Sequence, residues 1–407
     1  MFSLVDSSTR RDEGLSVEAW YAPIRRLDNH ALAGIEVQLR GPAGGPLATA
    51  HALRATARAL CEKRELDRLT WSVAQSIPGD GGTAPGGVPT LVTVDLESIA
   101  GLDSAAGAPP GPHIAIITRE SLTGDPARTL RAVAAARRDG MVIAVDEIGS
   151  DPNSLSLLPL IEPDVIILAP ALVAHPPDSA AARTAHAVAA QVELTGALVV
   201  ADGVDSPEHR LRALALGAAY GLGALYPAAG SPEALGRGDL APFPPVPRRP
   251  VEEPARSPYA LVAASRTPVR SSKRLLVHMS STLEIRAAAA GPETLVLGTF
   301  QRAEHFTEHA RTRWRNMAER IAYAGVYGVG MGPIAEDGIH FAPLDPEDPL
   351  VEEWNVVVLG PHFCCALSGT DLHRGERDQD REFDYVVSYD RPTVVRCARS
   401  ILDRFTT

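Results

Sequence analysis

The sequence predicts an α/β protein, in which a closed TIM-like (β/α)8 barrel is followed by a smaller α/β or α+β domain. Three observations predict this fold class. Short, nearly continuous apolar runs alternate with helical segments in the first half of the chain, as in a parallel sheet that helices cover on both faces. A proline-rich segment interrupts this pattern, and a second series of strands and helices follows. A length of 407 residues also exceeds what one hydrophobic core usually organises.

The barrel prediction depends on strand candidates that are separated by helical periodicity. The strand candidates cover residues 91–99, 113–120, 140–148, 163–170 and 196–204, and the helical segments cover 50–77, 125–138, 179–194 and 206–216. A stretch that resembles a β-hairpin, residues 18–41, precedes them. Together these elements suit a closed barrel.

Composition divides the chain into four parts. Residues 1–16 form an N-terminal extension, 17–238 the barrel, 239–269 a linker and 270–407 the second domain. Residues 239–258 contain seven prolines and no apolar period, which is typical of an extended, semi-rigid spacer.

Charge and hydropathy exclude several classes of function. The formal net charge of -11 argues against direct nucleic-acid binding, which needs a basic surface. No apolar run reaches the roughly 18 to 20 residues that a membrane helix requires, and the N-terminus does not read as a signal peptide. We therefore expect a cytoplasmic protein without a membrane partner.

Acidic residues follow several of the predicted strands. They are Glu36, Asp95, the adjacent pair Asp146 and Glu147, Asp202 and Asp205. Chemistry in a parallel barrel takes place at the carboxyl ends of the strands, where such acids would meet. Clustered carboxylates attract hard cations such as Mg²⁺ or Ca²⁺, so this end of the barrel is the candidate site.

The same motifs carry a family resemblance. The succession "GIEVQLRG", "VTVDLES", "VIAVDEIGSDPNSLSLL", "EPDVIILAPALV" and "LVVADGVDSPEHRLRALALGAAYGLGALYP" resembles the EAL family of cyclic di-GMP phosphodiesterases and receptors, over roughly residues 17–235. The resemblance implies two-metal hydrolysis of a phosphodiester. It also implies that Glu36, Asp95, Asp146 and Glu147 stand at metal-binding positions, that Arg40 contacts a ligand phosphate, and that Asp202 and Asp205 each replace a Glu.

Four further positions depart from the family pattern. Ile116, or Ile117 in a shifted alignment, stands where the family has a metal-binding Glu, and Ile167 stands where it has the catalytic Lys. Ala169 replaces an Asp, and Leu222 replaces a Gln. A general base typically contributes about 10² to 10⁴ in rate, so we expect a degenerate, non-catalytic barrel.

Three alternatives stay open for the acids. They either sit at a solvated strand end, where Asp146 caps a loop, or hold a single Mg²⁺ or Ca²⁺ ion through Glu36, Asp95 and Asp146. The third alternative is a working two-metal centre with residual phosphodiesterase activity. Binding of cyclic di-GMP without hydrolysis is a separate alternative, since inactive members of this family can be receptors.

The second domain resembles another family. "SSKRLLVHMSSTLE", "LVLGTFQRAEHFTEHARTRWRNMAER", "DPLVEEWNVVVLGPHFCCALSG" and "REFDYVVSYDRPTVVRCARSILDRF" resemble the DICT sensory domain. The resemblance implies a sensor of a small ligand or a site for a signalling partner protein. Phe300, Gln301 and Trp354 are candidate pocket residues, although aromatic rings in this domain also suit core packing. By analogy with EAL barrels we expect a homodimer.

Overall fold

The computed structural model describes residues 2–4, 15–77, 83–84, 88–99, 114–117, 125–235, 238–244 and 256–404. Contacts between residues divide the chain into two compact units. The first comprises Met1–Thr118, Ala132–Ser150 and Pro163–Val251, and the second comprises Arg119–Arg131, Asp151–Glu162 and Glu252–Thr407. Within the described residues no helix is long and apolar enough to cross a membrane.

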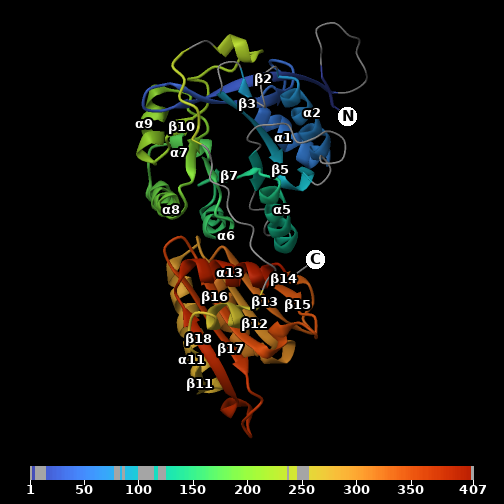
Figure 1. Ribbon diagram of the computed structural model, residues 1–407, viewed down its shortest axis with the longest axis vertical. Coiled ribbons are helices and arrows are strands. Elements are labelled where there is room, and N and C mark those ends of the chain that lie inside the picture. Colours follow the sequence, from blue (N-terminus) through green and yellow to red (C-terminus); the bar gives the residue numbers. More distant parts are fainter. Residues whose placement is uncertain are drawn as a thin grey trace. The chain divides into compact units, whose positions relative to one another are not determined.

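Eight strands of the first unit close into a barrel, in the order β2-β10-β9-β8-β7-β6-β5-β3, with β3 pairing back to β2 (Figure 1). This confirms the predicted fold class. The barrel strands are β2 (Leu15–Arg26), β3 (Leu32–Arg40), β5 (Val88–Asp95), β6 (Ile114–Ile117), β7 (Val142–Ile148), β8 (Val165–Leu168), β9 (Leu198–Ala201) and β10 (Tyr220–Gly221). Two short strands join them: β1 (Phe2–Leu4) pairs with β2, and β4 (Thr83–Ala84) pairs with β5.

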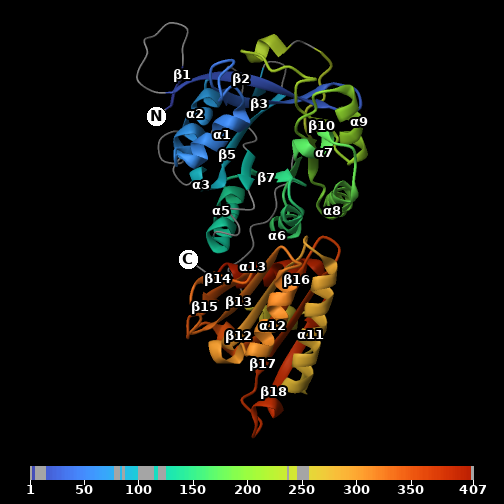
Figure 2. The ribbon, with the colours of Figure 1, turned by 180° about the vertical axis from the view of Figure 1, so that it is seen from behind.

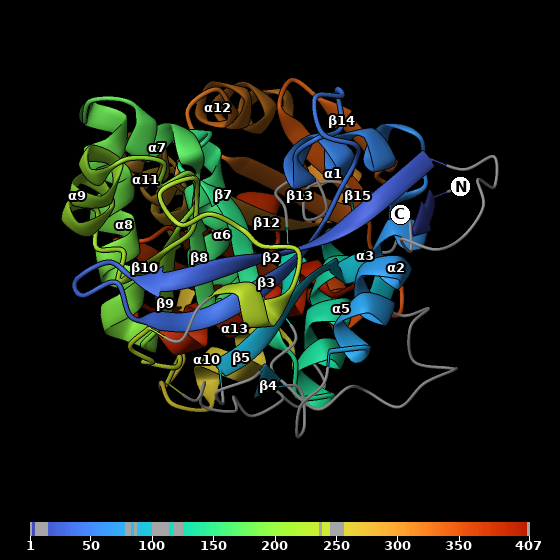
Figure 3. The same cartoon turned by 90° about the horizontal axis from the view of Figure 1, so that it is seen from above.

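The barrel departs from a regular (β/α)8 barrel at its first strand. β2 runs antiparallel to both of its neighbours, β3 and β10, whereas the other neighbouring strands of the barrel are parallel. A short turn can join antiparallel strands, but parallel strands need a long crossover, and only residues 27–31 separate β2 from β3. Figure 3 shows these two strands side by side.

Helices connect the parallel strands, and the predicted helical segment 50–77 forms two helices that are separated at residues 60–62. The helices are α1 (Ala50–Ala59), α2 (Lys63–Gln75), α3 (Leu96–Ile99), α5 (Pro126–Arg138), α6 (Leu157–Ile161), α7 (Pro170–Ala174), α8 (Ser179–Thr195) and α9 (Pro207–Ala215), with 3-10 turns η1 (Pro152–Ser156) and η2 (Pro232–Leu235). Side chains of Thr49, Asp178 and Ser206 accept backbone hydrogen bonds at the starts of α1, α8 and α9, which stabilises helix ends by about 1 kcal/mol each.

The second unit contains a sheet in the order β11-β18-β17-β16-β12-β13-β15-β14. Its strands are β11 (Val269–Ser272), β12 (Leu295–Arg302), β13 (Tyr323–Val329), β14 (Ile334–Glu336), β15 (Ile339–Pro343), β16 (Glu353–Leu359), β17 (Cys364–Asp371) and β18 (Glu382–Ser388). Its helices are α10 (Pro258–Ala263), α11 (Lys273–Ala290), α12 (Glu308–Ala318) and α13 (Arg391–Leu402), and its 3-10 turns are η3 (Ala303–His305), η4 (Pro349–Glu352) and η5 (Asp378–Asp380).

Helices cover both faces of this sheet. The side chain of Glu353 accepts a hydrogen bond from the backbone of Tyr259 in α10, whereas Trp354, the next residue of β16, donates to Ser280 of α11. Successive side chains of a strand point to opposite faces, so α10 and α11 lie on opposite sides. Figure 2 shows α11 and α12 together on one side.

Two parts of the predicted linker 239–269 belong to folded elements. The backbone N–H groups of Ala241 and Phe243 donate to Leu32 and Ala33 of β3, and the Phe243 ring packs against Tyr220, with centroids 4.6 Å apart. Further along, α10 buries Leu261 and Val262. A count of prolines misses both segments because it does not register apolar side chains between the prolines. Residues 245–255 lie outside the described residues.

The core of the second unit is built around Trp314 of α12. The indole is fully buried, its Nε1 donates to Glu284 of α11 over 3.1 Å, and a Cβ added at Gly298 of β12 would lie 2.8 Å from the ring. The ring therefore fills the space between two helices and the sheet.

Trp314→Ala should lower the free energy of unfolding of this unit by about 3 to 5 kcal/mol, as the loss of a buried aromatic ring does. Urea unfolding followed by circular dichroism measures it. Ile285→Ala, at a side chain 71% exposed on α11, is the matched control and should change stability by less than about 0.5 kcal/mol. Equal effects of the two variants would contradict this description of the core.

Candidate functional site

Three of the predicted acids lie in or directly after barrel strands and interact electrostatically with one another. Glu36 lies in β3, Asp146 in β7, and Asp202 directly follows β9. Burial, and then the charges of Glu36 and Asp146, raise the pKa of Asp202 to about 7. Burial is also the largest cause that raises the pKa of Asp146 to about 6, with Glu147 and Glu36 adding to it. These carboxyl groups therefore lie near enough to repel one another's ionised forms.

Glu36 is held by hydrogen bonds along its own strand and from the next. Its two carboxylate oxygens accept from Thr93 Oγ1 (2.8 Å) and from Gln38 Nε2 (2.7 Å). Gln38 Oε1 in turn accepts from the Arg40 guanidinium (2.8 Å), which lies 5.3 Å from the Trp20 ring centroid. Alternate residues of a strand share a face, so Glu36, Gln38 and Arg40 lie in a row and their side chains can form this series of hydrogen bonds.

Gln38 is a site residue that our sequence reasoning did not single out. It occupies the last position of the E-V-Q triplet, where the resemblance expects Leu. An amide can donate to a carboxylate and accept from a guanidinium at the same time. That capacity, together with the i, i+2, i+4 spacing, was the signal that could have identified it.

The Asp95 carboxylate is paired with basic side chains and does not join the cluster of Glu36, Asp146 and Asp202. Its buried carboxylate lies 2.5 Å from Lys63 Nζ at the start of α2 and 3.6 Å from the Arg58 guanidinium of α1. Its backbone N–H donates to Asp67. These groups line a small polar pocket together with Arg54, Leu66 and Ile116. The expectation that Asp95 joins Glu36 and Asp146 around one cation is therefore not met in this structure, because Lys63 supplies the positive charge.

Glu147 and Asp205 belong to loops beside the site. The Glu147 backbone has a positive φ of 57°, and its N–H donates to Asp146 Oδ1 over 2.7 Å. Asp205 is exposed, and its Oδ1 accepts from the backbone of Ala224 over 2.7 Å. The Asp146 side chain thus accepts from the next residue, while within the predicted loop 149–154 the side chain of Asp151 accepts from the backbone of Asn153.

The four positions at which the resemblance expects polar groups carry apolar side chains, and their surroundings in the fold are apolar too. Ile116 and Leu222 belong to one hydrophobic cluster with Ile24, Ala144 and Val200, and Ile167 packs against it. Ala169 is 2% exposed and directly precedes α7 as its N-cap residue. Transfer of an unpaired charge into such surroundings is costly, so the barrel interior beneath the acids favours neutral groups.

The arrangement does not fit a pair of metal ions. Among the residues that the structure describes, no three His, Cys, Asp or Glu side chains form a group that could hold a metal. Glu36 is hydrogen-bonded to two neutral groups, and Asp95 is paired with Lys63. We therefore derive no chemistry through a bound metal.

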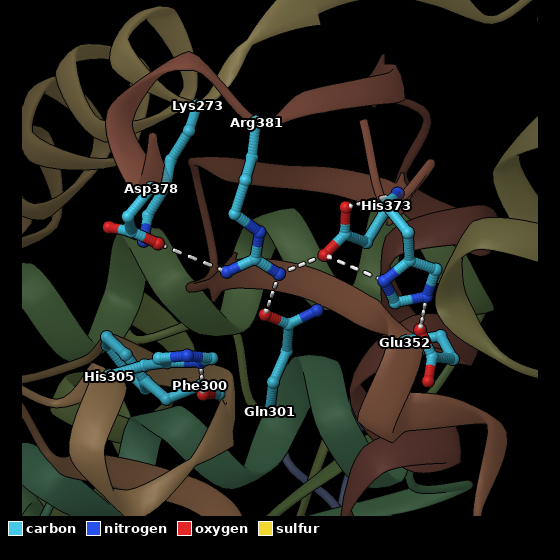
Figure 4. A network of polar contacts seen from close by, with 9 residues as sticks. Lys273, Phe300, Gln301, His305, Glu352, His373, Asp378 and Arg381 are labelled. Atoms are coloured by element: carbon cyan, nitrogen blue, oxygen red, sulfur yellow. Dashed lines mark hydrogen bonds and ion pairs between the residues drawn. The ribbon is translucent and has the colours of Figure 1, made fainter. Parts of the chain in front are cut away.

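The candidate pocket residues of the second domain do not share one cavity wall. The Phe300 ring packs against Phe306 and Trp314, with centroids 4.8 and 5.7 Å away, while the Trp354 ring packs edge-on against Phe383 at 6.1 Å. Phe300 and Trp354 thus join the core, as the alternative of core packing predicts. Gln301 instead accepts a hydrogen bond from Arg381 in a polar cluster (Figure 4).

Two known families match part of the chain each. Residues 92–229 match the EAL domain, and residues 259–371 match the "sensory domain in diguanylate cyclases and two-component system", DICT. The chain contains an EAL domain followed by a DICT domain. These matches support a protein with an EAL domain and a DICT sensory domain, and neither match alone covers half of the chain.

Several solved structures are similar to about half of the chain. The Xanthomonas citri FimX EAL domain in complex with c-diGMP is 17% identical, with 52% of this chain and 88% of that chain covered and a TM-score of 0.40. Klebsiella pneumoniae BlrP1 in a calcium and c-diGMP complex is 19% identical, with coverages of 55% and 57% and a TM-score of 0.42. Vibrio cholerae LapD is 14% identical, with coverages of 51% and 53% and a TM-score of 0.40. The chain therefore spans little more than half the length of BlrP1 and LapD, and no curated protein matches it.

The acid cluster should make the EAL domain less stable as pH rises. A carboxyl whose pKa is raised on folding contributes stability at low pH that is lost between its unfolded value, about 4, and its folded value. For Asp202, with a folded pKa of about 7, the loss between pH 4 and 7 should reach about 2 to 4 kcal/mol. Asp202→Asn should flatten this dependence in urea unfolding with chelator present.

The control for this prediction is Asp139→Asn, at an exposed carboxyl beyond the end of α5. This variant should keep the pH dependence of the parent protein. A parent protein whose stability rises from pH 5 to pH 8 would contradict the prediction.

Proposed function

We propose that this chain is a non-catalytic signalling protein, in which the EAL barrel works as a receptor, scaffold or regulator and the DICT domain as its sensor. The observation that carries the proposal is the apolar environment of Ile167. This residue stands where the resemblance expects the catalytic Lys, and it packs on the same cluster as Ile116 and Leu222. No group at that position can accept a proton from water.

Phosphodiester hydrolysis by a two-metal mechanism requires several of these groups at once. A two-metal mechanism needs carboxylates free to coordinate cations and a group that helps deprotonate the attacking water. Here Asp95 forms an ion pair with Lys63, and Glu36 accepts a hydrogen bond from Gln38. Ile116 stands where the resemblance expects a metal-binding Glu. Protons and internal hydrogen bonds, instead of cations, then balance the charge of the acids.

A cyclic di-GMP receptor is the second candidate function. It is supported by Arg40, a half-buried guanidinium that Gln38 and Trp20 hold in place at the position of the phosphate-binding arginine. A fixed guanidinium binds a phosphate with little further loss of entropy. A residual metal-dependent phosphodiesterase is the least favoured alternative. We further propose that the protein is cytoplasmic and that it forms a homodimer. Light scattering tests the homodimer through its molar mass.

When the protein is incubated with cyclic di-GMP and Mg²⁺ or Mn²⁺, linear dinucleotide should form no faster than without protein. Chromatography measures its formation. An active EAL phosphodiesterase run in parallel shows that the assay works. Metal-dependent turnover that Glu36→Ala abolishes would overturn the non-catalytic proposal.

Calorimetric titration with cyclic di-GMP distinguishes receptor from scaffold. If the barrel is a receptor, binding should persist in chelator, and Arg40→Met should weaken it at least about tenfold, since a lost charged hydrogen bond costs roughly 1.5 to 3 kcal/mol. Arg138→Met, at an exposed residue of α5, is the matched control. A flat trace for the parent protein would leave the scaffold function and exclude the receptor.

A further inference from the structure

A polar cluster lies at one end of the DICT sheet, where four chain segments meet (Figure 4). Lys273 is the first residue of α11, Gln301 lies near the end of β12, His305 ends η3, and Arg381 directly precedes β18. The backbone N–H of Lys273 donates to the carbonyl of Arg381 over 2.7 Å, which fixes the two cationic residues side by side. None of our sequence arguments assigned a role to these two cations.

The two cations have partners of different kinds. Arg381 pairs with Asp371, whose side chain is 0% exposed, so this ion pair is part of the interior. Lys273, only 14% exposed, has both carboxylate oxygens of Asp378 at 2.6 Å from its Nζ, yet the Asp378 side chain is 68% exposed. Asp378 also accepts from Arg381 Nη1 at 3.3 Å. A half-buried ammonium is thus neutralised by a carboxylate that a surface turn, η5, supplies.

Gln301 offers this cluster an additional donor. Its backbone has a positive φ of 57° next to an irregularity in the pairing of β12 with β13, and the residue is 5% exposed. For a residue other than Gly, such a conformation costs about 1 kcal/mol or more and is common at binding sites. The side-chain oxygen accepts from Arg381 over 3.2 Å, whereas the amide nitrogen has no hydrogen-bond partner within the described residues.

His305 completes the cluster as a neutral group. Its Nδ1 donates to the carbonyl oxygen of Phe300 over 3.1 Å, since a carbonyl can only accept. Burial lowers the pKa of His305, and Lys273 and Arg381 lower it further, so the ring is uncharged at neutral pH. On the far side of Asp371, His373 lies 2.6 Å from Glu352. The charge that faces Asp378 therefore comes from Lys273 and Arg381.

We propose that Lys273, Arg381 and the Gln301 amide form an anion-binding site of the DICT domain, and that the Asp378 carboxylate occupies it in place of a ligand. The ligand class is a small molecule with a carboxylate or phosphate group, because two fixed cations and a free amide donor suit such an oxyanion. Ligand binding would release η5 from α11, which gives the sensor two states. This inference rests on the proposed sensor function of the DICT domain.

The test is calorimetric titration of the full chain with inorganic phosphate and with acetate, at constant ionic strength. A tethered carboxylate competes at an effective concentration on the order of millimolar, so Asp378→Ala should raise phosphate or acetate affinity by at least about tenfold. The matched control is Asp380→Ala, in the same turn, whose carboxylate pairs with Arg377 outside the cluster and whose loss should change nothing. Tighter binding of phosphate would indicate a ligand with a phosphate group, and tighter binding of acetate would indicate a ligand with a carboxylate group.

A second variant makes the result unambiguous. Asp378→Ala combined with Lys273→Met should lose the gained affinity, while near-ultraviolet circular dichroism shows that the domain stays folded. Equal anion affinity in the Asp378→Ala and Asp380→Ala variants, or binding that persists without Lys273, would overturn the site. Because the hydrolysis assay depends on the barrel alone, failure of this site is distinguishable from failure of the non-catalytic proposal.

Discussion

The barrel depends on one constraint: the charge of acidic side chains beside an apolar interior must be balanced. Asp146 and Asp202 come close to Glu36, and the interior beneath them is filled by Ile116 and Leu222. Burial, and then the neighbouring carboxylates, disfavour the ionised forms of both aspartates and raise their pKa, so that protons balance part of the charge. The other part comes from hydrogen bonds to Glu36. The same constraint makes an unpaired catalytic ammonium at position 167 unfavourable.

The two domains treat charge in contrasting ways. In the EAL barrel a cation of the chain itself, Lys63, sits on Asp95. In the DICT domain an anion of the chain itself, Asp378, sits on Lys273. Each ion pair satisfies a charged group that would otherwise need a partner from solution, and each is formed by a side chain next to a helix start or a turn. Displacement of an internal ion pair by a ligand is the kind of event on which the proposed regulatory function depends.

Periodicity could predict most of the fold, and what it missed has physical reasons. The apolar runs at 140–148, 163–170 and 196–204 are strands because each is buried on both sides. The hairpin of β14 and β15 was missed, although Asp337 and Gly338 between them both have positive φ, the turn that an Asp-Gly pair favours. Within the predicted linker, Phe243 and α10 pack onto neighbouring elements, which the proline count could not indicate. For the site, position along the strands singled out Glu36, Asp146 and Asp202, and their role stays a prediction. Strand position could not show that the side chain of Asp95 turns to Lys63, since rotamers depend on neighbours far apart in the sequence.

The most direct test of this account is a carbon-detected NMR titration of the side-chain carboxyl groups of Asp146 and Asp202, with chelator and then with millimolar Mg²⁺. The account predicts pKa values well above those of ordinary aspartates and no displacement by Mg²⁺, because protons and internal partners balance the cluster. A drop of both values below about 4, the ordinary range of a carboxyl, together with proton release when Mg²⁺ is added, would contradict it. That outcome would show a metal centre that is still in use.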